Sequence, residues 1–183
     1  KGKIAHYGVS IEKVSEGLQA MNYPISAIEV VFNMFRLKPT EELFPAAIAK
    51  NIGIIARVPL ASGLLTGRYT KDTTFGANDH RSYNRNGEAF DKGETFSGVD
   101  YDLGLQAVAA LKDVFGTDDL IPYALRWVLM HDAVSAVIPG ASRREQLLSN
   151  VRAAELPALS SEQMDAVRAI YDRYLRASIH ENW

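Results

Sequence analysis

The sequence predicts an α/β fold built from parallel β/α units. Short apolar runs rich in β-branched residues alternate with segments of helical spacing, and this strand-then-helix pattern occurs four times along the chain. The composition is that of a globular protein, with 47% hydrophobic and 23% charged residues. A chain of 183 residues can bury about 70% of its unfolded surface in one domain. We therefore expect a single domain over residues 1–183, forming either half of an eight-fold barrel or a small doubly wound sheet.

The first unit begins close to the start of the sequence. The run Ile4–Val9 is typical of a strand, and Ile11, Val14, Leu18 and Met21 follow it at helical spacing. These positions predict a helix directly after the strand.

The second unit begins with Ala27–Phe32, a run rich in β-branched residues that predicts the next strand. After Pro39 and Thr40, the segment Glu41–Asn51 predicts a helix that begins with two acidic residues. Negative charge is favourable at that end of a helix, because the N-terminus carries a partial positive charge.

The third strand is predicted over Ile52–Val58, and a long polar segment, Thr70–Asp100, interrupts the unit that it begins. This segment contains several glycines and no helical period. Loops of this length in a compact domain are usually functional lids, and a disordered insertion is the alternative. Aromatic residues such as Phe75, Tyr83 and Phe90 recur through the segment, which favours the functional interpretation.

The fourth strand is predicted over Val134–Gly140. The remaining helices are expected over Tyr101–Phe115, Leu120–Met130, Ser142–Asn150, and from the capping box of Ser160 and Gln163 through Tyr174.

The composition also limits the classes of function. A net charge of −2 gives no basic surface for nucleic acid. There is no cysteine, so disulfides and thiolate metal sites are excluded, and we assign no metal site. No apolar run is long enough to cross a membrane, and the first residues lack the pattern of a signal peptide. We therefore expect a cytoplasmic protein without membrane or nucleic-acid partners.

The stretch RVPLASGLLTGRY, Arg57–Tyr69, follows the third strand and predicts a close approach between backbone and ligand. Pro59 fixes the direction in which the chain leaves the strand, and the glycines allow unusual backbone angles and close contact.

Several segments together resemble the aldo-keto reductases: GKIAHYGVS, EVVFNMF, IIARVPLASGLLTGRY, ALRWVL and VIPGASRREQLLSN. They occur in that family's order and at its spacing, and the resemblance covers nearly the whole chain. It implies the second half of a (β/α)8 TIM-type barrel, strands five to eight, with the C-terminal helices. The family's catalytic Asp, Tyr, Lys and His lie on the first half, so the resemblance implies no catalytic residue in this chain.

The resemblance implies an NADP(H) site, and three positions would meet the nicotinamide. Ser10 is placed against the carboxamide, although it could instead cap the following helix. Glu29 stands where the family usually has a glutamine, and Arg57 where it usually has a stacking aromatic residue. These two departures suggest an ion pair between Glu29 and Arg57, because adjacent strands would set them side by side. Ile11 replaces a residue that is commonly polar, so one polar contact is missing.

The loop after the third strand is implied to wrap the pyrophosphate with backbone N–H groups, through Pro59, Leu60, Ser62 and Gly63. Arg68 resembles the basic residue that anchors this loop over the phosphates, and a solvated loop arginine is the alternative.

The segment after the fourth strand is implied to hold the 2′-phosphate and the adenine, through Gly140, Ser142, Gln146 and Asn150. A helix N-terminus suits a phosphate, because it presents free N–H groups. Ser142 and Glu145 also form the pattern of a capping box, so helix formation alone can explain them.

Arginines would supply the positive charge for the 2′-phosphate. Arg143 and Arg144 are adjacent and point in different directions, so at most one of them is expected to face the ligand. Arg81, in the long polar segment, is a further candidate.

The implied activity of the parent protein is reduction of an aldehyde or ketone by hydride transfer from NADPH. Its partners would be a small carbonyl substrate and the absent N-terminal half of the barrel. Two alternatives stay open: a nucleotide-binding regulatory module without turnover, and a half-barrel that pairs with a second copy, because four parallel units leave two open sheet edges.

Overall fold

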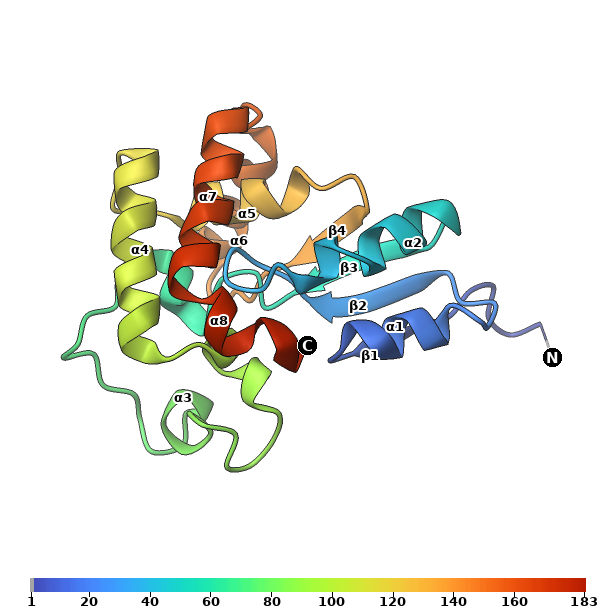
Figure 1. Ribbon diagram of the computed structural model, residues 1–183, viewed down its shortest axis with the longest axis horizontal. Helices are drawn as coiled ribbons and strands as arrows, with labels where there is room; N and C mark the ends of the chain where they lie inside the picture. The colour runs from blue at the N-terminus through green and yellow to red at the C-terminus, as the bar shows by residue number, and fades with distance from the viewer. Residues whose placement is uncertain (1) are drawn as a thin grey trace.

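The structure, a computed structural model that describes residues 2–183, contains one sheet of four parallel strands (Figure 1). The strands are β1 (Gly8–Ile11), β2 (Ala27–Val31), β3 (Gly53–Arg57) and β4 (Val134–Ile138). They pair in the order β1-β2-β3-β4, each with its neighbour along the chain. The predicted α/β class with parallel units is confirmed.

Helices separate the strands and follow the last of them. They are α1 (Val14–Ala20), α2 (Leu43–Ala49), α3 (His80–Tyr83), α4 (Tyr101–Phe115), α5 (Ile121–Leu129), α6 (Arg144–Arg152), α7 (Ser161–Tyr174) and α8 (Arg176–Ile179). Short 3₁₀ turns cover Lys38–Thr40, Ala61–Thr66, Lys92–Glu94, Phe96–Gly98, Ala153–Glu155 and His180–Asn182. Helices α4 and α7 pack side by side (Figure 1). No helix in the described part of the chain is long and apolar enough to span a membrane.

The first strand is displaced from its predicted position of Ile4–Val9. Strand β1 begins only at Gly8, which pairs with Ala27, the first residue of β2. Residues before Gly8 have almost no partner strand beside them, and Ile4 is 72% exposed. The prediction was wrong because an apolar run alone does not show where the neighbouring strand begins.

The first helix also begins later than predicted. Helix α1 starts at Val14, and the carboxylate of Glu16 accepts hydrogen bonds from the backbone N–H groups of Glu12 (2.9 Å) and Lys13 (3.0 Å). Ser10 lies inside β1, so its alternative role as the cap of this helix is wrong.

Two predicted caps of later helices have different outcomes. The capping box at α7 is confirmed: Ser160 Oγ accepts from Gln163 N at 3.2 Å, and Gln163 Oε1 accepts from Ser160 N at 3.0 Å. The acidic residue predicted to begin the second helix lies outside it, because α2 begins at Leu43. Glu41 instead accepts hydrogen bonds from Arg176 (2.8 Å) and His180 (3.1 Å).

One face of the sheet is buried and the other is partly open. Ile28 and Val30 of β2 and Ile54 and Ala56 of β3 are at most 1% exposed and belong to the core. Most of the residues that alternate with them, including Glu29, lie on the opposite face and are only partly covered, whereas Val31 at the end of β2 is buried. In a closed barrel this opposite face would point inward.

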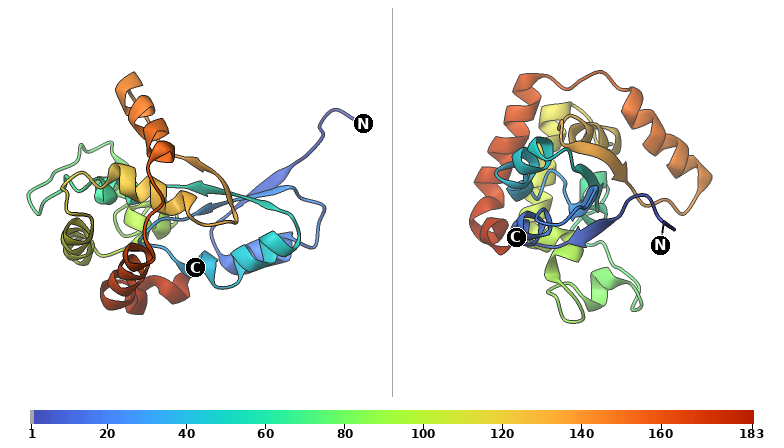
Figure 2. Two further views of the ribbon diagram at one scale, coloured as in Figure 1. Left: turned by 90° about the horizontal axis from the view of Figure 1, so that it is seen from above. Right: turned by 90° about the vertical axis from the view of Figure 1, so that its right-hand side faces the viewer.

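Both edges of the sheet are open in the described residues. Strands β1 and β4 each pair with only one neighbour. Large apolar side chains are exposed near both edges: Ile4, Tyr7 and Tyr23 near β1, and Ile138, Leu147, Leu148 and Val151 in β4 and α6. Helix α6 stands away from the body of the molecule in both views of Figure 2.

The long polar segment is ordered rather than a disordered insertion. It contains α3 and two 3₁₀ turns, and Asn84, Thr95, Phe96 and Ser97 are at most 1% exposed. The Trp183 ring packs against glycines of this segment. A Cβ atom added at Gly98 would lie 2.9 Å from the ring.

Candidate functional site

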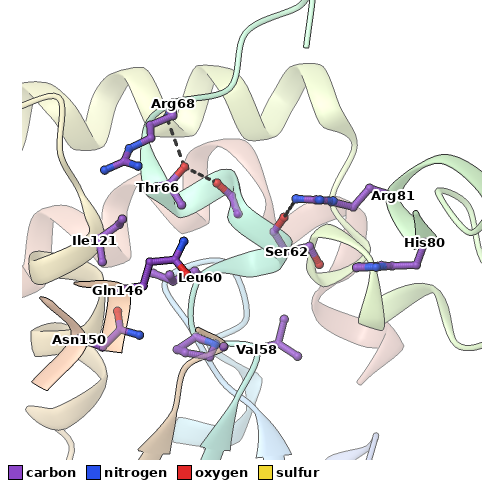
Figure 3. Close-up of a pocket in the computed structure, with 13 residues that line it drawn as sticks. Val58, Leu60, Ser62, Thr66, Arg68, His80, Arg81, Ile121, Gln146 and Asn150 are labelled. Carbon is purple, nitrogen blue, oxygen red and sulfur yellow. Dashed lines mark hydrogen bonds between the residues drawn. The ribbon is translucent and has the colours of Figure 1, made fainter. Parts of the chain in front are cut away.

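A cavity of about 440 Å³ lies at the carboxyl ends of β3 and β4 (Figure 3). Nine predicted residues line it: Pro59, Leu60, Ser62, Gly63, Arg68, Arg81, Gly140, Gln146 and Asn150. Its lining also includes Val58, Thr66, His80 and Ile121, which sequence reasoning missed. Ligands in β/α barrels bind at this end of the strands, where the connecting loops converge.

The loop after β3 has an unusual backbone. Val58, Ala61 and Ser62 have φ angles of 52°, 47° and 53°, in the left-handed region that non-glycine residues avoid. Each costs on the order of 1 kcal/mol and persists only where neighbouring groups fix it. Such strain is concentrated at functional sites, but nothing in the amino-acid types at these positions signals it.

Gly63 is required for a reason that differs from the predicted one. A Cβ atom at this position would lie 2.2 Å from the hydroxyl oxygen of Tyr69, and the residue has a φ of +99°. The glycine therefore makes room for a tyrosine of the same chain. At Gly140, by contrast, an added Cβ would meet nothing within 4 Å.

The Ser62 hydroxyl is occupied within the protein. It donates a hydrogen bond to the carbonyl oxygen of Glu94 (3.0 Å) and accepts one from the backbone N–H of Phe96 (3.0 Å). Ser62 lines the cavity, but its side chain holds the long segment.

Arg81 lines the cavity with its charge already balanced. Its Nε and Nη2 donate to the two carboxylate oxygens of Asp79 at 2.8 and 2.5 Å, and Nη1 donates to the Tyr69 hydroxyl. Nη1 also donates to the Ser62 carbonyl at 3.4 Å (Figure 3). The hydrogen bonds from Arg81 hold the pKa of Asp79 at about 2. Arg81 therefore has less charge to offer a phosphate than sequence reasoning supposed.

Arg68 has weaker contacts within the protein than Arg81, the other arginine that lines the cavity. Its side chain is 67% exposed, and its guanidinium lies 3.9 Å from the carboxylate of Asp119. The backbone N–H of Arg68 donates to the Thr66 hydroxyl at 3.3 Å, which fixes the residue's position in the loop.

Helix α6 begins differently from the prediction. It starts at Arg144, and the Gln146 side-chain oxygen accepts from Ser142 N (2.8 Å), Ser142 Oγ (3.1 Å) and Arg143 N (3.2 Å). The expected capping box of Ser142 with Glu145 is therefore wrong. The NH₂ group of Gln146 remains to meet a ligand, because its oxygen is already used. Ser142 and Arg143 are exposed beside the cavity and are not part of its lining.

Asn150 contributes an unsatisfied donor. Its Nδ2 atom is buried and has no hydrogen-bond partner in the structure. A buried amide donor without a partner is uncommon in proteins, and this one is available to a group that enters the cavity.

Ser10, Glu29 and Arg57 lie outside this cavity: Ser10 is in β1, Glu29 is in the middle of β2, and Arg57 ends β3. Ser10 pairs with Glu29 across the sheet, and Glu29 Oε1 lies 3.8 Å from Arg57 Nε. The predicted ion pair is present but long. The main partners of Arg57 are the carboxylates of Glu12 and Glu94, and it also donates to the Ile11 carbonyl at 3.2 Å.

Arg36 extends this group of charges into the core. It is 1% exposed, donates to the Glu12 carbonyl, and its guanidinium carbon lies 3.9 Å from the centre of the Trp183 ring. Burial lowers the pKa of Arg36 to about 10 and raises the pKa of Glu12. Sequence reasoning missed Glu12, Arg36 and Glu94, although a lone arginine within the apolar stretch EVVFNMFRL was an available signal.

Comparison with known proteins identifies the family. The protein-family model described as "Aldo/keto reductase family" matches residues 1–172. The chain belongs to the aldo-keto reductase family. The resemblance noted from the sequence is confirmed at this level.

Similar aldo-keto reductases are about twice as long as this chain. "Aldo-keto reductase str7" of Strobilurus tenacellus is 30% identical over 177 residues, which cover 93% of this chain and 49% of that protein. "L-glyceraldehyde 3-phosphate reductase" of Escherichia coli K12 is 28% identical, with 89% and 48% covered. The solved structure of the glycerol dehydrogenase AKR11B4 from Gluconobacter oxydans superposes with a TM-score of 0.72 at 28% identity, covering 95% of this chain and 51% of that one. The chain therefore spans about half the length of these aldo-keto reductases.

Proposed function

We propose that this chain is the NADP(H)-binding half of an aldo-keto reductase barrel, contributing strands five to eight as one domain over residues 1–183. The observation that carries the proposal is the cavity beside β3 and β4, which is lined by nine of the residues expected to bind the cofactor. The catalytic Asp, Tyr, Lys and His would come from the other half of the barrel. The parent protein would reduce a small aldehyde or ketone.

The residues of the cavity fit the phosphate and adenosine parts of the cofactor. Arg68 provides positive charge, Gln146 an NH₂ group, and Asn150 a buried donor without a partner. Helix α6 adds its N-terminal N–H groups, which favour an anion. Ser142 and Arg143 stand beside this end of the helix, where a 2′-phosphate would extend from the ribose.

The nicotinamide end of the cofactor would lie over β1 to β3, beside Ser10, Glu29 and Arg57, where it would supply the hydride. Ser10 and Glu29 are adjacent there, so a hydroxyl and a carboxylate can bind the two ends of the carboxamide. Ile11 is buried and apolar and offers no side-chain contact. Arg57, held by two carboxylates, presents a planar group where the family has an aromatic ring.

The complete protein is expected to prefer NADPH over NADH by about tenfold or more. One charged side chain that is hydrogen-bonded to the 2′-phosphate contributes about 1.5 to 3 kcal/mol to the binding free energy. No acidic residue occurs in Gly140–Arg144, so this segment has no carboxylate to select the bare ribose hydroxyl of NADH. Fluorescence titration of both cofactors at two salt concentrations measures the preference.

Single substitutions of Arg143 and Arg144 to alanine serve as mutual controls, because only one of them is expected to affect NADPH binding. Equal affinities for NADPH and NADH in the wild type would show that these residues serve only the start of α6. That result would contradict the proposed 2′-phosphate site.

The chain by itself is expected not to be a stable monomer. Its two open sheet edges carry exposed apolar residues, including Ile138 (48%) and Leu147 (54%). Unpaired parallel strands associate with further chains. Light scattering combined with thermal melting tests this: association with a second copy or aggregation is expected, whereas a compact monomer with a cooperative melt would contradict it. Defined dimers would favour the alternative of a self-pairing half-barrel.

A further inference from the structure

The loop 58–63, which lines the cavity, is joined to the long polar segment by contacts with Asn33, Glu94 and Ser97, which do not line the cavity. We propose that Asn33, Glu94 and Ser97 are positioning residues for cofactor binding, which set the shape of the loop 58–63 without touching the cofactor. The proposal rests on the assignment of the cavity to NADP(H). We call these contacts the loop clamp, formed by Asn33, Arg57, Ser62, Glu94 and Ser97.

Asn33 is the centre of the loop clamp. It follows β2, is completely buried, and its single NH₂ group donates to both the Val58 carbonyl (2.9 Å) and the Ser97 hydroxyl (2.8 Å). Its side-chain oxygen accepts from the N–H of Phe35 at 2.8 Å, so its direction is fixed. One amide therefore joins the cavity loop to a segment about 40 residues further along the chain.

The groups joined by Asn33 are strained on both sides. Val58 has a φ of 52°, and Phe96 and Ser97 have φ angles of 53° and 58°. β-Branched and bulky residues rarely adopt this conformation, and it persists only where the surroundings over-determine it. The hydrogen bonds of Asn33 supply that constraint at Val58 and Ser97.

Two further contacts fasten the same segments. The Ser62 hydroxyl bridges the Glu94 carbonyl and the Phe96 N–H, each at 3.0 Å. The Glu94 carboxylate forms an ion pair with Arg57, the last residue of β3. Neither Asn33, Glu94 nor Ser97 lines the cavity, whereas Val58 and Ser62 do. Asn33, Glu94 and Ser97 can therefore act on a ligand only through the residues that they hold, which are Val58, Ser62 and Arg57.

The test compares two ligands in the complete protein that carries this chain. NADPH needs the loop 58–63 for its pyrophosphate, whereas 2′,5′-ADP keeps the 2′-phosphate and only one phosphate of the pyrophosphate, so it depends mainly on the residues around α6. For Glu94→Gln, the Kd of NADPH is expected to rise about tenfold, while the Kd of 2′,5′-ADP changes less than about twofold.

Ser97→Ala checks the effect without a change of charge, and its effect is expected in the same direction. Glu88→Gln is the matched control, because Glu88 lies in the same segment and hydrogen-bonds only to Asn86. Thermal melts establish that each variant is folded. NADPH binding unchanged in both variants, or equal weakening of both ligands, would overturn the loop clamp. A wild-type protein that binds neither ligand would instead overturn the proposed function.

Discussion

Arg57→Ala should lower the free energy of unfolding of the folded assembly by about 3 kcal/mol. The Arg57 side chain is 11% exposed and lies between the carboxylates of Glu12 and Glu94, which are 29% and 30% exposed. Removing the guanidinium leaves two partly buried negative charges facing each other. Chemical denaturation followed by circular dichroism measures the loss.

The loss of unfolding free energy in Arg57→Ala should depend on pH and on whether the neighbouring carboxylates are present. Burial raises the pKa of Glu12, and the loss of Arg57 removes the charge that opposes this rise, so the native state takes up a proton as the pH falls. The destabilisation is then smaller near about pH 5 than near about pH 8. Adding Glu94→Gln to Arg57→Ala should recover about 1 kcal/mol, because only one carboxylate then remains.

Glu29→Gln is the matched control for this group of charges. Glu29 lies 3.8 Å from Arg57 and is 36% exposed, so its loss should cost no more than about 0.5 kcal/mol. If Glu29→Gln and Arg57→Ala destabilise equally, then Glu12 and Glu94 are not the partners that hold Arg57.

The 183-residue chain by itself should show no steady NADPH-dependent reduction of an aldehyde. A positioned proton donor contributes roughly 10² to 10⁴ in rate, and the proposed function assigns that group to the other half of the barrel. Consumption of NADPH with a reactive aldehyde is followed by absorbance at saturating cofactor.

The control for this assay is the complete protein, measured under the same conditions. Turnover restored in that protein supports the proposed division between cofactor binding and proton transfer. Steady turnover by the isolated chain would contradict it. A complete protein that binds NADPH without turnover would favour the regulatory alternative.

The sequence predicted the regular parts of the fold well, because they depend on local patterns. Helix α4 has the predicted bounds of Tyr101–Phe115, and the starts and ends of β2, β3 and β4 lie within two residues of prediction. The start of β1 was not predictable in the same way, since it is set by the position of Ala27 on another strand.

The candidate site was predicted only where a motif identifies it. The loop after β3 and the start of α6 have recognisable sequences, and most of their predicted residues line the cavity. The contacts of Arg57 with Glu12 and Glu94 join residues 45 and 37 positions apart. Pairing at such separations follows from the fold and leaves no local pattern in the sequence. The same is true of the left-handed backbone at Val58.

The order of the strands has a consequence for how this chain is made. Because β1, β2, β3 and β4 lie in the sheet as they occur in the sequence, each new strand can add to the growing edge as it leaves the ribosome. The C-terminal helices contact the segment that follows β2: Arg176 and His180 bind Glu41, and Trp183 covers Arg36. The strand order therefore permits the sheet to form progressively, and residues 176–183 secure the turn that follows the second strand.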